Sequence, residues 1–266
     1  MRDITINVDL ATEAEPAVAC ALALARRYGA VLTGLQIMPP NLLGSFGMPD
    51  ALSLSDQEAA ERRAWWRELC RRHEVAGELE LPQGSYVPTL ARRSLLSDLL
   101  VSPLPVESPQ APTVAGELSR ALFAGSAPLL LIPHGYVGSF DFRSVAIGWN
   151  GSPEALRAIH AALPLLREAD DVTVFDGDRG MPPGMPPALP PLPLREWLGR
   201  QGIRFRWIGF APEQDIGPAL HGEAQARHAE LLVMGAWGRS RMSELVLGGA
   251  TRWLLAHTRM PLLLAH

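Results

Sequence analysis

Short apolar runs alternate along the chain with segments whose apolar residues recur at helical spacing. In the first half, the pattern predicts strands at residues 4–9, 30–38, 78–81, 98–102 and 128–132, and helices at 13–28, about 55–73, from about 88 onward and 113–124. The same order then begins again, with strands at 145–152, 172–176, 204–210, 231–235 and 261–264 and helices at 153–167, 194–201 and 216–229. Strands that alternate with helices are typical of a parallel α/β sheet.

Two stretches carry local signals of their own. Ser55-Asp56-Gln57-Glu58 has the capping-box pattern, in which a serine and a glutamate three residues apart satisfy the first free N–H groups of a helix. Residues 181–193 are dense in proline, which excludes helix and sheet and favours extended backbone. The first stretch predicts a helix start, and the second predicts a long loop inside the second half.

The two halves are a repeat. Residues 127–131 (Ala-Pro-Leu-Leu-Leu) match 260–264 (Met-Pro-Leu-Leu-Leu), residues 97–101 match 229–233, and Asp9 corresponds to Asn150. Residues 133–142 hold two glycines and no helical period, so they predict a linker between a domain at 1–134 and a domain at 143–266. The predicted fold is therefore α/β, with two doubly wound, parallel, five-stranded sheets in tandem.

Glycines follow the buried strand 231–235 at a regular spacing. Gly235 is separated by two residues from Gly238 and by a further nine from Gly248, after which a helix precedes the closing strand. A loop at the carboxyl end of a parallel strand lies where such sheets bind ligands, and N–H groups at a helix start attract anions. The spacing thus indicates an anion-binding loop, although glycines in this number also fit a tight turn without a ligand.

The spacing resembles the G-x2-G-x9-G-(S/T) signature of the universal stress protein family, and the repeat resembles its tandem form over nearly the whole chain. The resemblance implies a Rossmann-like fold, similar to the adenine nucleotide alpha-hydrolases, and an adenine nucleotide as ligand. Two residues depart from the family pattern. Gly249 stands where the family has Ser or Thr, and Asn150 stands where the family has Asp at the end of the first strand.

The resemblance also implies a role for each site residue of the second half. Met234 and Gly235 would lie beneath the ribose, Gly238 would let the loop pass close to the phosphates, and Arg239 would add charge there or remain an exposed loop residue. Trp237 would stack on a ring or shield the loop. The backbone N–H groups of Gly248, Gly249 and Ala250 would bind phosphate at the helix start. Asn150 and the backbone near Gly177 would frame the base.

The first half carries a different pattern at the same places. It retains Asp9, but residues 102–109 contain three prolines, which lack N–H groups, and Glu107, which would repel phosphate. The resemblance therefore implies that the first half is structural and that the second half holds the site.

Composition narrows the function classes. The 266-residue chain is 47% hydrophobic with a net charge of −4 and a pI near 6, which argues against nucleic acid as a partner. It contains no lysine, which excludes a P-loop and Schiff-base chemistry. No apolar run is long enough for a bilayer, and Met1-Arg2-Asp3 lacks a signal-peptide layout, so we expect no membrane association and a cytoplasmic location.

Neither the cysteines nor the histidines form a recognisable metal pattern. Cys20 and Cys70 lie in helical segments and fit small buried apolar residues. His221 and His228 are two turns apart on the predicted helix, about 10 Å along its axis, which is too far to share one ion. We therefore expect no metal held by the protein itself.

Two functional interpretations follow, and a third has little support. The chain is a stress-response sensor or regulator that binds ATP (with Mg) or AMP in its second half, or it is an interaction module of the same fold that binds no nucleotide or another small molecule. An enzyme would need a catalytic constellation, and none is visible. The resemblance further implies that strands 129–131 and 262–264 pair as an intramolecular pseudo-dimer, with a homodimer of chains left open.

Overall fold

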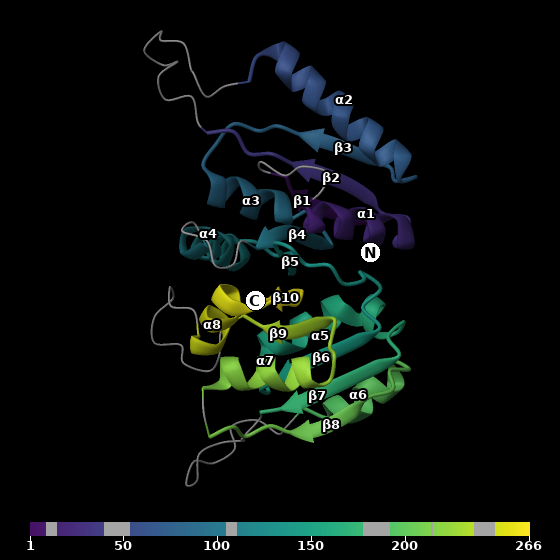
Figure 1. Cartoon of the computed structure of the whole chain (residues 1–266), viewed down its shortest axis with the longest axis vertical. Coiled ribbons are helices and arrows are strands. Elements are labelled where there is room, and N and C mark those ends of the chain that lie inside the picture. Colours follow the sequence, from purple (N-terminus) through teal and green to yellow (C-terminus); the bar gives the residue numbers. More distant parts are fainter. Residues whose placement is uncertain (9–14, 40–53, 105–110, 178–191, 214, 237–247) are drawn as a thin grey trace. The chain divides into compact units, whose positions relative to one another are not determined.

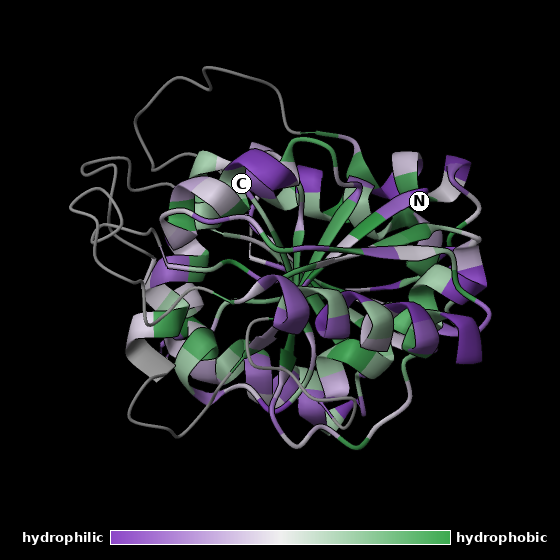
Figure 2. Ribbon diagram, turned by 90° about the horizontal axis from the view of Figure 1, so that it is seen from above, coloured by the Kyte–Doolittle hydropathy of each residue, from purple (hydrophilic) through white to green (hydrophobic). Residues whose placement is uncertain are grey.

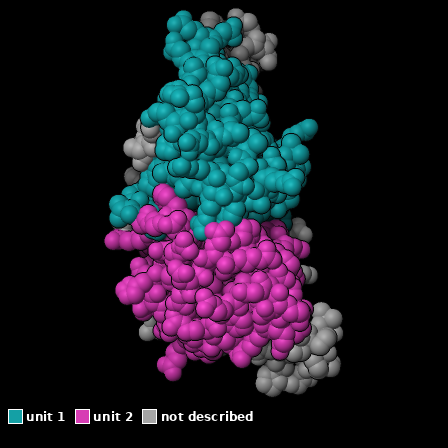
Figure 3. Space-filling model, turned by 90° about the vertical axis from the view of Figure 1, so that its right-hand side faces the viewer, with its two compact units in different colours: residues 1–137 teal, residues 138–266 magenta. Residues whose placement is uncertain are grey.

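The computed structural model describes residues 1–8, 15–39, 54–104, 111–177, 192–213, 215–236 and 248–266. The chain divides into two compact units, which Figure 3 colours separately: unit 1, Met1–Val137, and unit 2, Gly138–His266. The boundary between the units lies inside the segment 133–142. Among the described helices, none combines the length and the apolar character needed to cross a membrane.

Unit 1 is a parallel sheet with the strand order β3-β2-β1-β4-β5 (Figure 1). Its strands are β1 (Asp3–Asn7), β2 (Val31–Leu35), β3 (Gly77–Glu80), β4 (Leu99–Leu104) and β5 (Leu129–Pro133). Its helices are α1 (Pro16–Tyr28), α2 (Asp56–Arg72), α3 (Tyr86–Ser94) and α4 (Ala111–Ala124). The helix α1 packs on the central strands, and α3 packs against α4.

Unit 2 repeats this arrangement with the strand order β8-β7-β6-β9-β10. Its strands are β6 (Ser144–Trp149), β7 (Asp171–Asp176), β8 (Arg206–Gly209), β9 (Leu231–Gly235) and β10 (Leu262–Ala265). Its helices are α5 (Pro153–Leu166), α6 (Leu194–Arg200), α7 (Ile216–Ala226) and α8 (Gly249–His257). The two predicted doubly wound sheets are confirmed, and Figure 2 shows hydrophobic residues concentrated on the strands between the helices.

The strand register fixes which residues of the two units are equivalent. In unit 1, β1 pairs with β4 with Ile4 opposite Leu99, and in unit 2, β6 pairs with β9 with Val145 opposite Leu231. Counting along both pairs, Asn7 is the counterpart of Gly148, and Ser102 is the counterpart of Met234. The sequence repeat is therefore also a repeat of strand register.

Several boundaries differ from the sequence prediction, and two of them have a clear structural reason. The fourth strand was predicted to end at residue 102, but Pro103 and Leu104 extend β4, since the ladder with β5 continues through Leu104 opposite Pro133. Proline is tolerated there because β4 pairs with β1 only as far as Val101. The helix α7 ends at Ala226, not near residue 229, and His228 takes a left-handed φ of 54° beyond its end.

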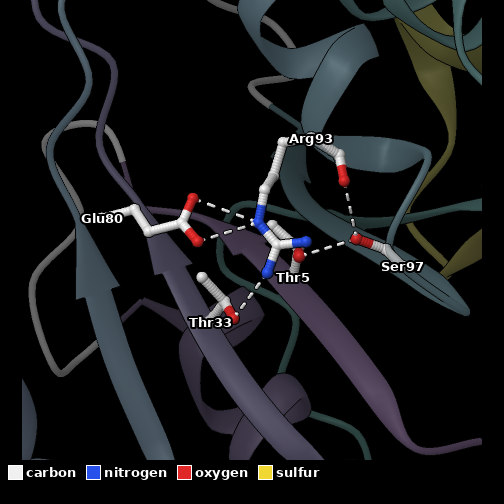
Figure 4. Close-up of polar contacts among 5 residues, drawn as sticks. All are labelled: Thr5, Thr33, Glu80, Arg93 and Ser97. Atoms are coloured by element: carbon white, nitrogen blue, oxygen red, sulfur yellow. Dashed lines mark hydrogen bonds and ion pairs between the residues drawn. The ribbon is translucent and has the colours of Figure 1, made fainter.

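A polar network holds α3 against the sheet of unit 1 (Figure 4). The guanidinium of Arg93 donates to both carboxylate oxygens of Glu80 at 3.1 Å and to the hydroxyl of Thr33 at 2.8 Å. Thr5 and Ser97 share a hydroxyl hydrogen bond of 2.8 Å beside it. The Arg93 side chain is only 15% exposed, so its ion pair with Glu80 is better shielded from solvent than a surface pair.

The predicted capping box at the start of α2 is present. The Glu58 N–H donates to the Ser55 hydroxyl at 3.2 Å, and the Ser55 N–H donates to the Glu58 carboxylate at 2.8 Å. The first turn also carries Asp56 and Glu58, whose negative charges favour the positive end of the helix dipole.

Removing the cap should therefore destabilise the chain. We expect Ser55→Ala to lower the free energy of unfolding by about 1 kcal/mol, because one helix N–H loses its acceptor. Ser55→Thr keeps a hydroxyl that can accept from the Glu58 N–H and donate to the Glu58 carboxylate, as Ser55 does, and is the control that should stay near the native value. Urea unfolding of the three proteins measures the difference. An unchanged stability in Ser55→Ala would show that the cap contributes nothing.

Candidate functional site

A cavity of about 210 Å³ lies at the carboxyl ends of the strands of unit 2. It is at the point where the strand order reverses between β6 and β9, which is where ligands bind in doubly wound sheets. Its walls are mostly apolar and aromatic, and its polar residues come from β6 and α8. The described residues that line it are Gly148, Trp149, Asn150, Phe175, Gly177, Phe210, Pro212, Ile216, Leu220, Met234, Gly235, Gly248, Gly249, Ala250 and Thr251.

The turn after β6 sets the position of Asn150. Gly151 has a φ of 75°, which glycine adopts without strain, and the chain then enters α5 through Ser152. The Ser152 hydroxyl accepts from the Ala155 N–H at 3.1 Å, and the amide oxygen of Asn150 accepts from the Ser152 N–H at 3.1 Å. The side chain of Asn150 thus helps to build the turn. An amide oxygen has two lone pairs, so this one retains capacity for a second donor.

The end of β7 is tied to its neighbours by backbone hydrogen bonds. The Gly177 N–H donates to the Trp149 carbonyl at 2.8 Å, and the Phe210 N–H donates to the Asp176 carbonyl at 2.7 Å. The carboxylate of Asp176 accepts from the indole N–H of Trp207 at 2.9 Å. Gly177 therefore offers a ligand its carbonyl and close approach of the backbone, and its N–H is already used.

Gly235 has a packing reason to be glycine. A Cβ added there would lie 2.5 Å from the backbone nitrogen of Ala155 and 2.8 Å from the carbonyl carbon of Glu154. The strand β9 therefore runs directly against the first turn of α5, and only glycine permits this contact. The glycine lines the cavity as predicted, but helix packing alone is sufficient to explain its identity.

The start of α8 borders the cavity with Gly248, Gly249 and Ala250. Gly248 is the N-cap with extended backbone, and no described side chain caps the helix, so the first N–H groups lack intrahelical acceptors. Gly249 and Ala250 follow as the first helical residues. Within the part of the chain that the structure describes, a Cβ added at Gly249 would meet no atom within 4 Å, so there is room for a Cβ at this departure from the family pattern.

Sequence reasoning missed Thr251 and the aromatic wall. Thr251 is 2% exposed, lines the cavity and carries a hydroxyl in the first turn of α8. Phe175 and Phe210 pack edge to face with ring centroids 5.8 Å apart, and both border the cavity. The position of Thr251, three residues after Gly248 at the expected helix start, could have indicated it from the sequence. The two phenylalanines, in contrast, are brought together only by the pairing of β7 with β8.

The structure brings most of the predicted site residues to one place. Asn150, Gly177, Met234, Gly235 and residues 248–250 all line the cavity. Trp237, Gly238 and Arg239 lie outside the described residues, as do Asp9 and Glu107 of the first half. Among the described lining residues none carries a charge.

His221, a buried titratable group of unit 2, follows the lining residue Leu220 on α7. His221 is 7% exposed and packs edge to face on Trp253 of α8, with ring centroids 5.6 Å apart. Burial, together with the positive charge of Arg259 and with His257, lowers its pKa from the ordinary value. His221 and His228 were predicted to lie two turns apart on one helix, but α7 ends at Ala226, so His228 lies beyond it. The described residues contain no group of three side chains that could hold a metal ion.

The chain has no match among family models, and none among curated proteins. Its fold is similar to a universal stress protein from Archaeoglobus fulgidus, with a TM-score of 0.70 and 15% identity over 99% of this chain and 96% of that one. A protein of unknown function from Pseudomonas aeruginosa gives a TM-score of 0.64 and 13% identity over 99% and 92%. A second protein of that species, assigned to the universal stress proteins, gives 0.62 and 13% over 100% and 93%. These likenesses confirm the expected fold.

The lowered pKa of His221 predicts a loss of stability in mild acid. Because its folded-state pKa lies below the ordinary value near 6.5, the unfolded chain binds the proton more readily, and stability falls as the pH drops from about 7 through the folded-state pKa. We expect His221→Leu to shrink the decrease in urea midpoint between pH 7.5 and pH 5. The half-buried His266, whose pKa burial also lowers, leaves a residual decrease. His73→Leu, at an exposed position, is the control, and an unchanged decrease in His221→Leu would contradict the prediction.

Proposed function

We propose that unit 2 binds an adenine nucleotide and that the protein is a nucleotide-responsive regulator of the universal stress protein type. One observation carries the proposal. A helix start with free N–H donors and a mostly apolar, partly aromatic wall border the same cavity at the switch point of the sheet. The aromatic wall suits a base, and the helix start suits a phosphate. The likeness in fold to a solved universal stress protein agrees with the family that the glycine spacing resembles.

The residues of the cavity fit such a ligand. Asn150, with one lone pair free, and the carbonyl of Gly177 would receive donors of the base or the ribose. The N–H groups of Gly249 and Ala250 and the hydroxyl of Thr251 would bind phosphate, and Gly238 and Arg239 stay part of the proposal as loop residues. No carboxylate is among the described lining residues, so Mg would arrive with ATP and be held by its phosphates.

The role we propose is binding, in the cytoplasm, with an adenine nucleotide as the principal partner and neither nucleic acid nor membrane involved. None of the described lining residues is a titratable base, so hydrolysis is not part of the proposal. The pairing of strands 129–131 and 262–264 as a pseudo-dimer within the chain, and a homodimer of chains, belong to the same proposal.

A second candidate is a site for a neutral small molecule, or an interaction module that binds no nucleotide. The wall favours it, because Phe175, Phe210, Ile216, Leu220 and Met234 are apolar and the described lining residues carry no cation to pair with phosphate. The helix start favours the nucleotide. Ligand charge therefore separates the two candidates.

Thermal unfolding with added ligand tests the function. The full chain should unfold at a higher temperature in millimolar Mg-ATP, ADP or AMP, since a ligand at a hundred times its dissociation constant adds about 2.7 kcal/mol. Adenosine at equal concentration reports how much of the affinity comes from phosphate. A midpoint that none of the phosphorylated ligands changes would remove the nucleotide proposal, and a response to adenosine alone would favour the second candidate.

Two substitutions at Gly249 sharpen the test. The space around this residue admits a side chain, so both variants should fold, and an Asp in the first turn favours the helix dipole. We expect Gly249→Ser to bind AMP about tenfold more tightly, because its hydroxyl adds a hydrogen bond to phosphate, and Gly249→Asp to bind AMP about tenfold more weakly. Adenosine should bind all three proteins alike. AMP affinities that are equal across the three, measured by titration calorimetry, would place phosphate elsewhere.

A further inference from the structure

The positions that line the cavity of unit 2 have equivalents in unit 1, and the residues there differ. By strand register, Asn7 corresponds to Gly148 and Ser102 corresponds to Met234. The first turns of α3 and α7 also align, because Tyr86-Val87-Pro88-Thr89-Leu90 matches Ile216-Gly217-Pro218-Ala219-Leu220 with both prolines in the third position. Three residues that line the cavity, Gly148, Ile216 and Met234, therefore have the counterparts Asn7, Tyr86 and Ser102.

In unit 1 these three counterparts contact one another. The side-chain amide of Asn7 donates to the Tyr86 hydroxyl at 2.6 Å and lies 3.4 Å from the Ser102 hydroxyl. Asn7 is 4% exposed, so its side chain occupies the interior between β1, β4 and α3. Its amide oxygen is buried without a partner in the described structure. Such an unpaired acceptor normally opposes folding, so packing efficiency alone does not explain an asparagine here.

In unit 2 the residue equivalent to Asn7 is Gly148, which has no side chain to fill this space. A Cβ added to Gly148 would lie 3.0 Å from a methyl carbon of Leu220 and 3.4 Å from the Cβ of Met234. Both of these residues line the cavity, so any side chain at position 148 would project into it. An asparagine at this position would extend further than a Cβ and would occupy the volume that a ligand needs.

We propose that the residue at this position of the first strand decides whether a unit takes a ligand: Gly148 keeps the cavity of unit 2 open, and Asn7, bonded to Tyr86, closes unit 1. The chain therefore binds one ligand, not two. The inference concerns the same cavity as the proposed function and rests on that proposal only for the chemical identity of the ligand. The openness of the cavity can be tested with a different molecule.

The test uses two probes on the full chain. AMP, followed by titration calorimetry, reports the nucleotide site, and 5-fluoroindole, followed by fluorine NMR, reports an open apolar cavity irrespective of phosphate. Gly148→Asn should weaken both probes at least tenfold, and Gly148→Ala should weaken them less because the tightest contact of a methyl is with the flexible end of Leu220. Gly209→Asn is the matched control, since a Cβ at Gly209, in a strand of the same unit, meets no atom within 4 Å. Circular dichroism and urea midpoints confirm that each variant is folded.

The outcomes separate the two proposals. One equivalent of AMP per native chain, lost in Gly148→Asn and kept in Gly209→Asn, supports both. Uptake of 5-fluoroindole without AMP, again lost only in Gly148→Asn, removes the nucleotide and leaves Gly148 as the determinant of the open cavity. Two equivalents of either probe in the native chain would overturn the closure of unit 1. Unchanged affinity in a folded Gly148→Asn protein, or no uptake of either probe by the native chain, would overturn the role of Gly148.

Discussion

The close approach of β9 to the first turn of α5 is the contact on which the geometry of unit 2 depends. Gly235 lies so near the backbone of Glu154 and Ala155 that no side chain fits between them. This contact fixes where α5 begins, and the start of α5 fixes the cap by Ser152 and the turn that holds Asn150. The positions of β9 and of Asn150 in the cavity lining therefore both depend on Gly235, where only a glycine fits for steric reasons.

The sequence predicted the architecture because its signals are local. Apolar runs and helical spacing located the strands and helices, and the repeat of 97–101 at 229–233 anticipated the shared register of β4 and β9. The capping box at Ser55 was likewise a pattern of four adjacent residues. The glycine spacing pointed to Gly235 and Gly248, which both line the cavity, although a contact with α5 is enough to explain the glycine at position 235.

The site's walls could not be predicted because they depend on residues far apart in the chain. Asn7 and Tyr86 are 79 positions apart, and nothing in either stretch indicates that the amide and the phenol meet. Phe175 and Phe210 meet only because β8 pairs beside β7. The extension of β4 through Pro103 was hidden for a related reason, since it depends on where the pairing with β1 stops.

The two units hold equivalent helices in place by different forces, and this difference has consequences for a ligand. In unit 1, α3 is fixed to the sheet by directional polar contacts, those of Arg93 with Glu80 and Thr33 (Figure 4). In unit 2, α7 is fixed to α8 by close packing, because a Cβ at Gly217 would lie 3.1 Å from the Ala250 carbonyl oxygen. The residue so contacted is one whose N–H borders the cavity.

The apolar wall on α7 and the start of α8 are therefore packed directly against each other in unit 2. A ligand that contacts Leu220 at one end and the helix start at the other bridges two helices that already touch through glycine. Its binding would strengthen the contact between α7 and α8. In the described structure this contact depends on packing, including the ring contact of His221 with Trp253. The equivalent helix of unit 1 is held by the contacts of Arg93, so under the proposed function a ligand would add contacts between helices in unit 2 alone.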